Sequence, residues 1–80
     1  MLNARIGMNT GSDTYTIPED FTIRQAFEEA GIDYEGKAVI LNGGGCAPGV
    51  LDKTFRELGM DGTPGHDRVF LSAISKVDNA

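Results

Sequence analysis

The side chains best suited to chemistry are those of the one cysteine, Cys46, and the one histidine, His66. A catalytic thiol needs a base close to it, and His66 is the only histidine that could serve. Both residues lie in turn-rich segments on either side of a short helical turn predicted near 54–58, so their side chains could meet in space. No third residue that would orient the histidine is evident. A small thiol enzyme using Cys46 is therefore kept as an alternative hypothesis.

Cys46 belongs to the glycine-rich segment 43–49. The residues of possible function in this segment are Gly43, Gly44, Gly45 and Cys46. A phosphate-binding loop requires glycines that lead directly into a helix N-terminus, usually followed by Lys-Ser or Lys-Thr. Here Pro48 and Gly49 intervene, and Lys53 lacks that context. We therefore interpret the segment as a mobile, exposed connecting loop, with ordering by a partner as the alternative.

Few residues could bind a metal ion. His66 has only Asp61 and Asp67 as acidic neighbours in the sequence, which is too sparse a set for a zinc site. A single cysteine excludes a disulfide framework, a Cys-only metal site and an iron–sulfur cluster held by four thiolates. We expect no metal, no cofactor and no catalytic residue, and hence a protein that is not an enzyme.

The chain is acidic, with 12 Asp and Glu against 7 Lys and Arg and a formal net charge of −5. A nucleic-acid-binding face requires clustered positive charge. The basic residues are instead scattered singly, at Arg5, Arg24, Lys37, Lys53, Arg56, Arg68 and Lys76. Nucleic-acid binding is therefore not expected. An acidic cluster near the end of the predicted helix is either a solvated face or a docking surface for a basic partner; it contains Glu28, Glu29, Asp33 and Glu35.

Length and hydropathy restrict the class of protein. Eighty residues are enough for one small domain, 1–80, built around one core. The sequence has no run approaching 18 apolar residues, and its N-terminus lacks a charged segment followed by an apolar one. Together with the single cysteine, these features predict a soluble protein of a reducing compartment, the cytoplasm, that does not interact with a membrane.

One amphipathic helix is predicted over residues 21–31. Its apolar residues recur with helical spacing on one face, namely Ile23, Ala26, Phe27 and Ala30. Thr22 followed three residues later by Gln25 predicts an N-terminal capping box, and Gly31 predicts a left-handed end to the helix.

Strands and turns are predicted on both sides of this helix. Alternating polarity and β-propensity predict strands over 2–8, 14–17, 37–41 and 68–74. The first two form a hairpin through turn residues 9–13, and Asn42-Gly43 is a strong turn signal after the third. A short helix or 3₁₀ turn near 54–58 ends at Gly59. Residues 75–80 are predicted to be a flexible polar tail.

The order of these elements resembles the ubiquitin-like β-grasp fold. The features that carry the resemblance are a strand at the extreme N-terminus, one helix capped by Thr22, a strand ending in Leu41-Asn42-Gly43, and the Thr54-Phe55 turn before the last strand. The fold class implied is α+β, ββαββ, with one main helix on a mixed sheet of four to five strands. The Leu-Asn-Gly sequence at 41–43 resembles in particular that of the sulfur-carrier branch, the small proteins of thiamine and molybdopterin synthesis.

The chain departs from that branch at its end. The resemblance implies chemistry at a C-terminal diglycine, whose carboxylate is adenylated and then thiolated or joined to lysine. No glycine follows Gly65 in this sequence. We therefore do not carry the conjugation and sulfur-carrier activities over to this chain, and a divergent sulfur carrier or modifier is the second hypothesis.

Strand parity predicts which residues lie on each face of the sheet. Val39, Leu41, Val69 and Leu71 are expected to face the helix, which leaves an apolar patch on the other face, formed by Ile40 and Phe70 and flanked by Ala38 and Ser72. The resemblance implies that this surface binds a protein partner, and adjacent exposed apolar residues on a rigid sheet favour the same interpretation. Scattered surface apolar residues, or a patch covered by the 43–49 loop, are the alternatives.

The first hypothesis is accordingly a small noncovalent adaptor that binds a protein through this patch. Exposed outer strands could also pair between two copies as a homodimer. The predicted core contains Leu2, Ala4, Ile6, Ile17, Ile23, Phe27, Val39, Leu41, Phe55, Leu58, Val69 and Leu71.

Overall fold

The computed structural model describes residues 1–8 and 11–75. Its one α-helix, α1 (Ile23–Ala30), begins and ends as the sequence predicts. Thr22 Oγ1 accepts a hydrogen bond from the Gln25 amide at 3.1 Å, and Gln25 Oε1 accepts one from the Thr22 amide at 2.8 Å. These two bonds form the capping box, and they satisfy amides that the first helical turn leaves without partners. Gly31 ends the helix with φ of 70°.

The first two strands form a longer hairpin than the sequence predicts. β1 (Leu2–Met8) pairs antiparallel with β2 (Gly11–Ile17) along its whole length. The predicted start of the second strand at Thr14 is therefore wrong by three residues. Turn-type residues continue the ladder because Ser12 pairs with Gly7 and its hydroxyl accepts a hydrogen bond from Arg5 Nε at 2.9 Å. Residues 9 and 10 of the predicted turn lie outside the described residues.

The next hairpin corrects the interpretation of the glycine-rich segment. β3 (Lys37–Leu41) turns back through Asn42 and Gly43 into the short strand β4 (Gly44–Gly45). Both turn residues have positive φ, 49° and 87°, which are the angles of a two-residue type I′ turn. The predicted turn is confirmed. The expectation of a loop at 44–45 is wrong, because this tight turn returns the chain directly along β3.

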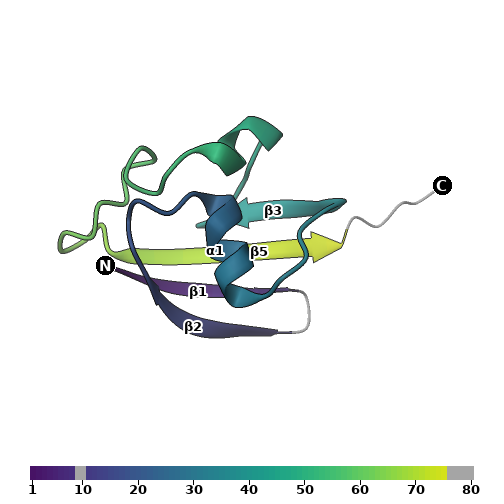
Figure 1. The fold of residues 1–80 in the computed structure, drawn as a ribbon, viewed down its shortest axis with the longest axis horizontal. Helices are drawn as coiled ribbons and strands as arrows, with labels where there is room; N and C mark the ends of the chain where they lie inside the picture. The colour runs from purple at the N-terminus through teal and green to yellow at the C-terminus, as the bar shows by residue number, and fades with distance from the viewer. Residues whose placement is uncertain (9–10, 76–80) are drawn as a thin grey trace.

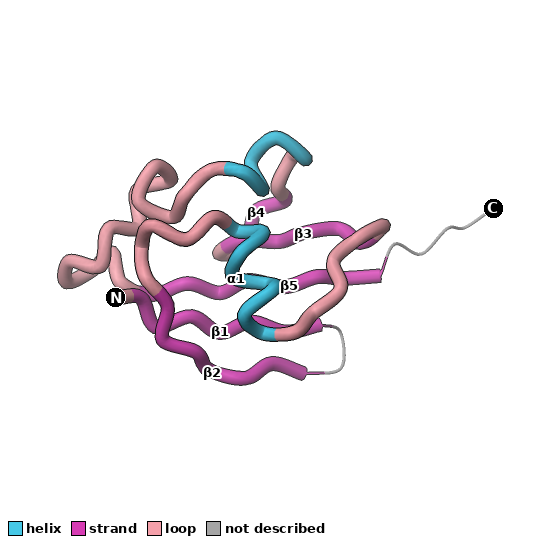
Figure 2. The backbone as a smooth tube through the Cα atoms, viewed as in Figure 1, coloured by secondary structure: helices cyan, strands magenta, loops and turns pink. Residues whose placement is uncertain are grey.

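The five strands form one mixed sheet in the order β2-β1-β5-β3-β4. The last strand, β5 (Arg68–Ser75), runs parallel to β1 and antiparallel to β3. It therefore includes Ser75, which was predicted to begin the tail; residues 76–80 lie outside the described residues. Helix α1 crosses one face of the sheet, and the segment between β4 and β5 extends along one side (Figures 1 and 2). The fold is thus a small α+β domain with one helix on a mixed five-stranded sheet.

The helical turn predicted near 54–58 forms only in part. A 3₁₀ helix, η1 (Pro48–Asp52), forms before this turn, and its first two residues belong to the segment 43–49 that was predicted to be a loop. The following residues form hydrogen-bonded turns and not a helix, although Thr54 and Glu57 form reciprocal capping hydrogen bonds at 3.1 Å. Gly59, with φ of 95°, ends these turns. The cap therefore forms as predicted, but the turn does not continue into a helix.

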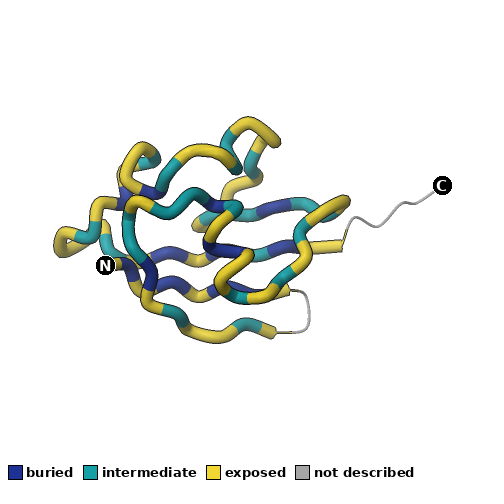
Figure 3. Tube along the Cα trace, in the orientation of Figure 1, coloured by how far each residue is buried: buried dark blue, intermediate teal, exposed yellow. Residues whose placement is uncertain are grey.

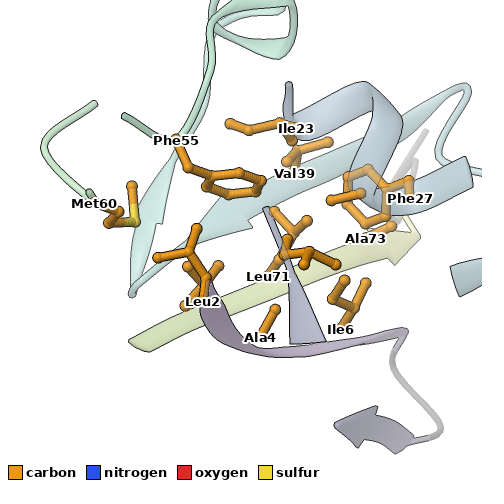
Figure 4. Close-up of a cluster of buried hydrophobic side chains, with 13 residues drawn as sticks. Leu2, Ala4, Ile6, Ile23, Phe27, Val39, Phe55, Met60, Leu71 and Ala73 are labelled. Carbon is orange, nitrogen blue, oxygen red and sulfur yellow. The ribbon is translucent and has the colours of Figure 1, made fainter. Parts of the chain in front are cut away.

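The core lies between α1 and the sheet (Figures 3 and 4). The predicted core is confirmed except for Leu41 and Leu58, which are half-buried at its border. Three residues that were not predicted are buried in it: Ala26, Met60 and Ala73. Phe55 reaches the interior because its amide donates to the carbonyl of Phe21 at 3.0 Å, which ties the segment after η1 to the segment before α1.

Charged residues reinforce the same junction. Arg56 donates to Asp20 at 2.9 Å and to Glu19 at 3.2 Å, and the amino group of Met1 lies 2.9 Å from Glu19 Oε2. The hydrogen bond from that amino group lowers the pKa of Glu19 below its ordinary value, with the charge of Arg56 adding to the effect. The hydrogen bond from Arg56 lowers the pKa of Asp20 in the same direction.

These lowered pKa values predict how stability depends on pH. A carboxyl group whose pKa is lower in the folded state binds protons more tightly in the unfolded state. Its contribution to the free energy of unfolding is therefore fully present at pH values above its pKa in the unfolded state. That contribution is lost as the pH falls through its pKa in the folded state. We expect the melting temperature to decline on acidification below about pH 5. Glu19→Gln with Asp20→Asn should lower it at neutral pH and make the decline shallower.

The control is Glu29→Gln, which removes an exposed carboxylate that forms no ion pair with the described residues. It should leave the shape of the melting temperature against pH unchanged. Calorimetry from neutral to acidic pH measures both curves. Equal slopes for the wild type and the double variant would show that Glu19 and Asp20 do not stabilise the junction.

Candidate functional site

The register of the strands separates two faces of the sheet. Buried residues on adjacent strands are aligned with one another and face α1, as in the pairs Ala4 with Val69 and Val39 with Ala73. The alternate positions lie on the other side, which we call the open face. It consists of Asn3, Arg5 and Gly7 of β1, Ser12, Thr14 and Thr16 of β2, Ala38 and Ile40 of β3, and Arg68, Phe70, Ser72 and Ile74 of β5.

The predicted patch residues all lie on the open face, but they differ in exposure. Phe70 is 53% exposed, whereas Ile40 is half-buried where it pairs with Ser72. Ala38 is also half-buried and pairs with Ile74, a residue that was not predicted as part of the patch and is 38% exposed. The parity that identified Phe70 also places Ile74 on this face. The apolar surface is therefore centred on β5 more than on β3.

Phe70 is held rigidly in spite of its exposure. It lies on β5, between β1 and β3, and Asn42 fixes its backbone. The Asn42 side-chain oxygen accepts a hydrogen bond from the Phe70 amide at 2.8 Å, and the Asn42 amide donates to the Phe70 carbonyl at 2.8 Å. The turn residue after β3 thus has a second role, which its turn propensity alone does not reveal. Because the Phe70 backbone is already fixed, binding a partner would cost conformational entropy only in its side chain.

A shallow depression of about 450 Å³ lies beside Phe70 on this face. It is lined by Asn3, Arg5, Thr14, Asn42, Arg68 and Phe70, among others. Arg5 is opposite Phe70 in the register of β1 and β5, and Arg68 precedes Phe70 by two residues on the same strand. The site therefore combines apolar surface with two guanidinium groups. Sequence reasoning missed both arginines, although strand parity places them on the same face as Phe70.

The glycine segment is part of the sheet edge. The amide of Cys46 donates to the carbonyl of Val39 at 2.9 Å, so the chain remains paired for one residue after β4. Burial raises the pKa of the half-buried Cys46 thiol, and the Leu41 backbone hydrogen bond offsets this only in part. The thiolate fraction at neutral pH is therefore smaller than for an ordinary cysteine, which is unfavourable for a nucleophile.

Cys46 and His66 lie far apart along the direction of the strands. Cys46 is level with Val39, which pairs with Ala73, whereas His66 precedes the first residue of β5, Arg68. Ala73 lies five positions after Arg68 along β5, a distance of roughly 16 Å. The structure therefore does not bring the two side chains of the hypothetical thiol site together.

A second hollow, of about 650 Å³, lies beside β3 and Cys46. Arg24 and Tyr34 are among its lining residues, and both side chains interact with neighbouring residues. Arg24 donates to Asp52 at 2.9 Å and to the Tyr34 hydroxyl at 2.8 Å, and the Tyr34 ring stacks on Phe27 with centroids 5.1 Å apart. These contacts have a structural role, since they tie η1 and segment 31–36 to α1.

The remaining predicted features lie on the surface. The four residues of the acidic cluster are all exposed, as is His66. Within residues 1–8 and 11–75 no group of three or more His, Cys, Asp and Glu side chains is arranged to hold a metal ion. In the same residues, no helix is long and apolar enough to cross a membrane. The two edges of the sheet are β2 and β4, so β2 offers an outer edge of seven residues for the predicted pairing between copies.

Comparison of the chain with protein-family models, with curated proteins and with solved structures finds no match.

Proposed function

We propose that this protein is a small noncovalent interaction module of the ubiquitin-like β-grasp type, which binds a protein partner through the open face of its sheet. The observation that carries the proposal is Phe70, an aromatic residue 53% exposed near the middle of a rigid sheet. Ile74 and Ile40 extend its apolar surface along β5 and β3. Binding to such a surface recovers the free energy of burying apolar area, about 25 cal/mol per Å².

The β-grasp assignment is supported by the arrangement of the elements. An N-terminal hairpin is followed by α1 and by β3, and the last strand returns to the centre of the sheet parallel to β1. This is the ββαββ order that the resemblance implies. The same resemblance implies use of the open face for noncovalent recognition.

The proposal is tested by affinity capture from a lysate of the source cell. Ile40→Asp with Phe70→Asp should reduce recovery of a specific partner by about tenfold or more, because hot-spot substitutions weaken binding by 2 kcal/mol or more. Circular dichroism establishes first that the double variant is folded. A control with two aspartates at exposed loop positions, Ala47→Asp with His66→Asp, should retain the partner. Equal recovery by all three proteins would refute the open face as the binding site.

Neither of the other hypotheses has an observation in its favour within the described residues. A sulfur carrier or modifier would act through the last residues of the chain, and 76–80 lie outside that range. A thiol enzyme would need Cys46 to ionise, and its raised pKa and its separation from His66 make the thiol a poor nucleophile.

A further inference from the structure

Charge is distributed unevenly over this acidic protein. The chain carries 12 Asp and Glu against 7 Lys and Arg. Yet the only charged residues among the open-face positions are Arg5 and Arg68, and none of those positions is acidic. A ligand that approaches the open face therefore meets positive charge, whereas the protein as a whole repels anions.

Neither Arg5 nor Arg68 forms an ion pair within the described residues. In the described part of the chain, Arg24 and Arg56 both pair with carboxylates, and neither Arg5 nor Arg68 does so. Arg5 donates from Nε to Ser12 at 2.9 Å, which orients the side chain across β2. No carboxylate of the described residues neutralises its guanidinium, so its charge is available to a ligand.

The spacing of the two arginines suits an extended peptide. Arg5 is opposite Phe70, and Arg68 is two residues before Phe70, so the two arginines are diagonal neighbours with Cα atoms roughly 8 Å apart. Alternate residues of an extended peptide lie about 7 Å apart on one side of its backbone. Two acidic residues at alternate positions could therefore each meet one guanidinium, provided that the Arg5 side chain exchanges its hydrogen bond to Ser12 for one to the ligand. Guanidinium–carboxylate hydrogen bonds are among the strongest that proteins form.

We propose that the depression beside Phe70 binds an acidic peptide segment, with carboxylates on Arg5 and Arg68 and an apolar side chain packed on Phe70. This inference rests on the proposed function, because it names the partner chemistry of the same face. A single-stranded nucleic acid fits less well. It would find one large exposed aromatic ring on the open face, where such proteins stack successive bases on several, and it would be repelled by the net charge of −5.

The test uses the full chain and a fluorescent peptide of sequence Gly-Ser-Glu-Ser-Glu-Ser-Leu-Ser-Gly, whose two glutamates and leucine lie on one side of an extended backbone. Matched peptides carry glutamine or lysine in place of glutamate. The wild type should bind the glutamate peptide about tenfold more tightly than either of the others, and added salt should weaken that binding. Arg5→Glu with Arg68→Glu should lose about tenfold in affinity for the glutamate peptide and gain affinity for the lysine peptide.

A control variant separates local from overall charge. Lys37→Glu with Lys53→Glu makes the same change in net charge at positions away from the open face, and it should retain affinity for the glutamate peptide. Equal losses in both double variants, equal binding of the glutamine peptide, no binding at millimolar peptide, or preferential binding of an oligothymidylate would each overturn the inference. If the arginine variants have no effect on a captured partner that Ile40→Asp with Phe70→Asp abolishes, the proposed function stands and the acidic partner does not. If neither the arginine variants nor Ile40→Asp with Phe70→Asp reduces capture of the partner, the proposed function and the acidic partner are both wrong.

Discussion

Replacing Phe27 with alanine is expected to lower the free energy of unfolding by about 3–5 kcal/mol, the range for truncating a buried phenylalanine. Its ring is fully buried on the sheet side of α1 and also stacks on Tyr34, at an interplanar angle of 25°. The variant loses the transfer free energy of the ring and leaves a cavity between helix and sheet. A domain of this size has few other apolar contacts to compensate, because small chains bury a small share of their surface.

Equilibrium denaturation with urea measures the loss for Phe27→Ala. The matched control is Phe70→Ala, which removes the same ring from a position 53% exposed on the opposite face. We expect the control to change stability much less, by about 1 kcal/mol or below. Similar losses for both variants would contradict the assignment of the two phenylalanines to a buried and an open face.

Replacing Gly7 with alanine is the second substitution expected to have a large effect. A Cβ atom built on Gly7 would overlap the carbonyl oxygen of Gly11 and the Cα and Cβ atoms of Ser12. Backbone atoms of β2 cannot move away like the end of a flexible side chain, so the two strands must separate locally. We expect a loss of about 1–3 kcal/mol, the range for overpacking a well-packed site.

The accompanying change should be confined to the first hairpin. Amide hydrogen exchange should quicken in β2 of Gly7→Ala more than in β3, since β2 is an edge strand that pairs with β1 alone among the described strands. Gly45→Ala is the matched control in a strand, because no atom lies within 4 Å of its added Cβ. A Gly7→Ala protein as stable as Gly45→Ala would show that the hairpin does not pack as closely as described.

Local signals in the sequence predicted the fold well where one interaction decides the structure. The capping box of Thr22 and Gln25 and the turn at Asn42-Gly43 both form because short-range hydrogen bonding and backbone angles determine them. The helical turn after Thr54 shows the limit of such reasoning. Its cap forms, but Phe55 is fixed by a hydrogen bond to Phe21, and a contact 34 residues away along the chain has no local signal.

Parity predicted part of the candidate site and could have predicted more. It placed Phe70 and Ile40 on one face, and the register confirms that they share it. The same alternation puts Arg5 and Arg68 beside Phe70 once the parallel pairing of β1 with β5 is known. That pairing joins segments more than 60 residues apart, which periodicity within each strand cannot specify. The exposure of Ile74 and the half-burial of Ile40 likewise depend on how neighbouring strands cover each residue.

The most direct test of binding through the open face is a nuclear magnetic resonance footprint of the isotope-labelled domain with its captured partner. The largest changes in amide shifts are predicted at open-face positions of the central strands: Arg5, Ile40, Phe70, Ser72 and Ile74. Amides of α1 and η1 should change little. A footprint centred on α1, on the acidic cluster or on segment 43–49, with the open-face amides unchanged, would contradict the account.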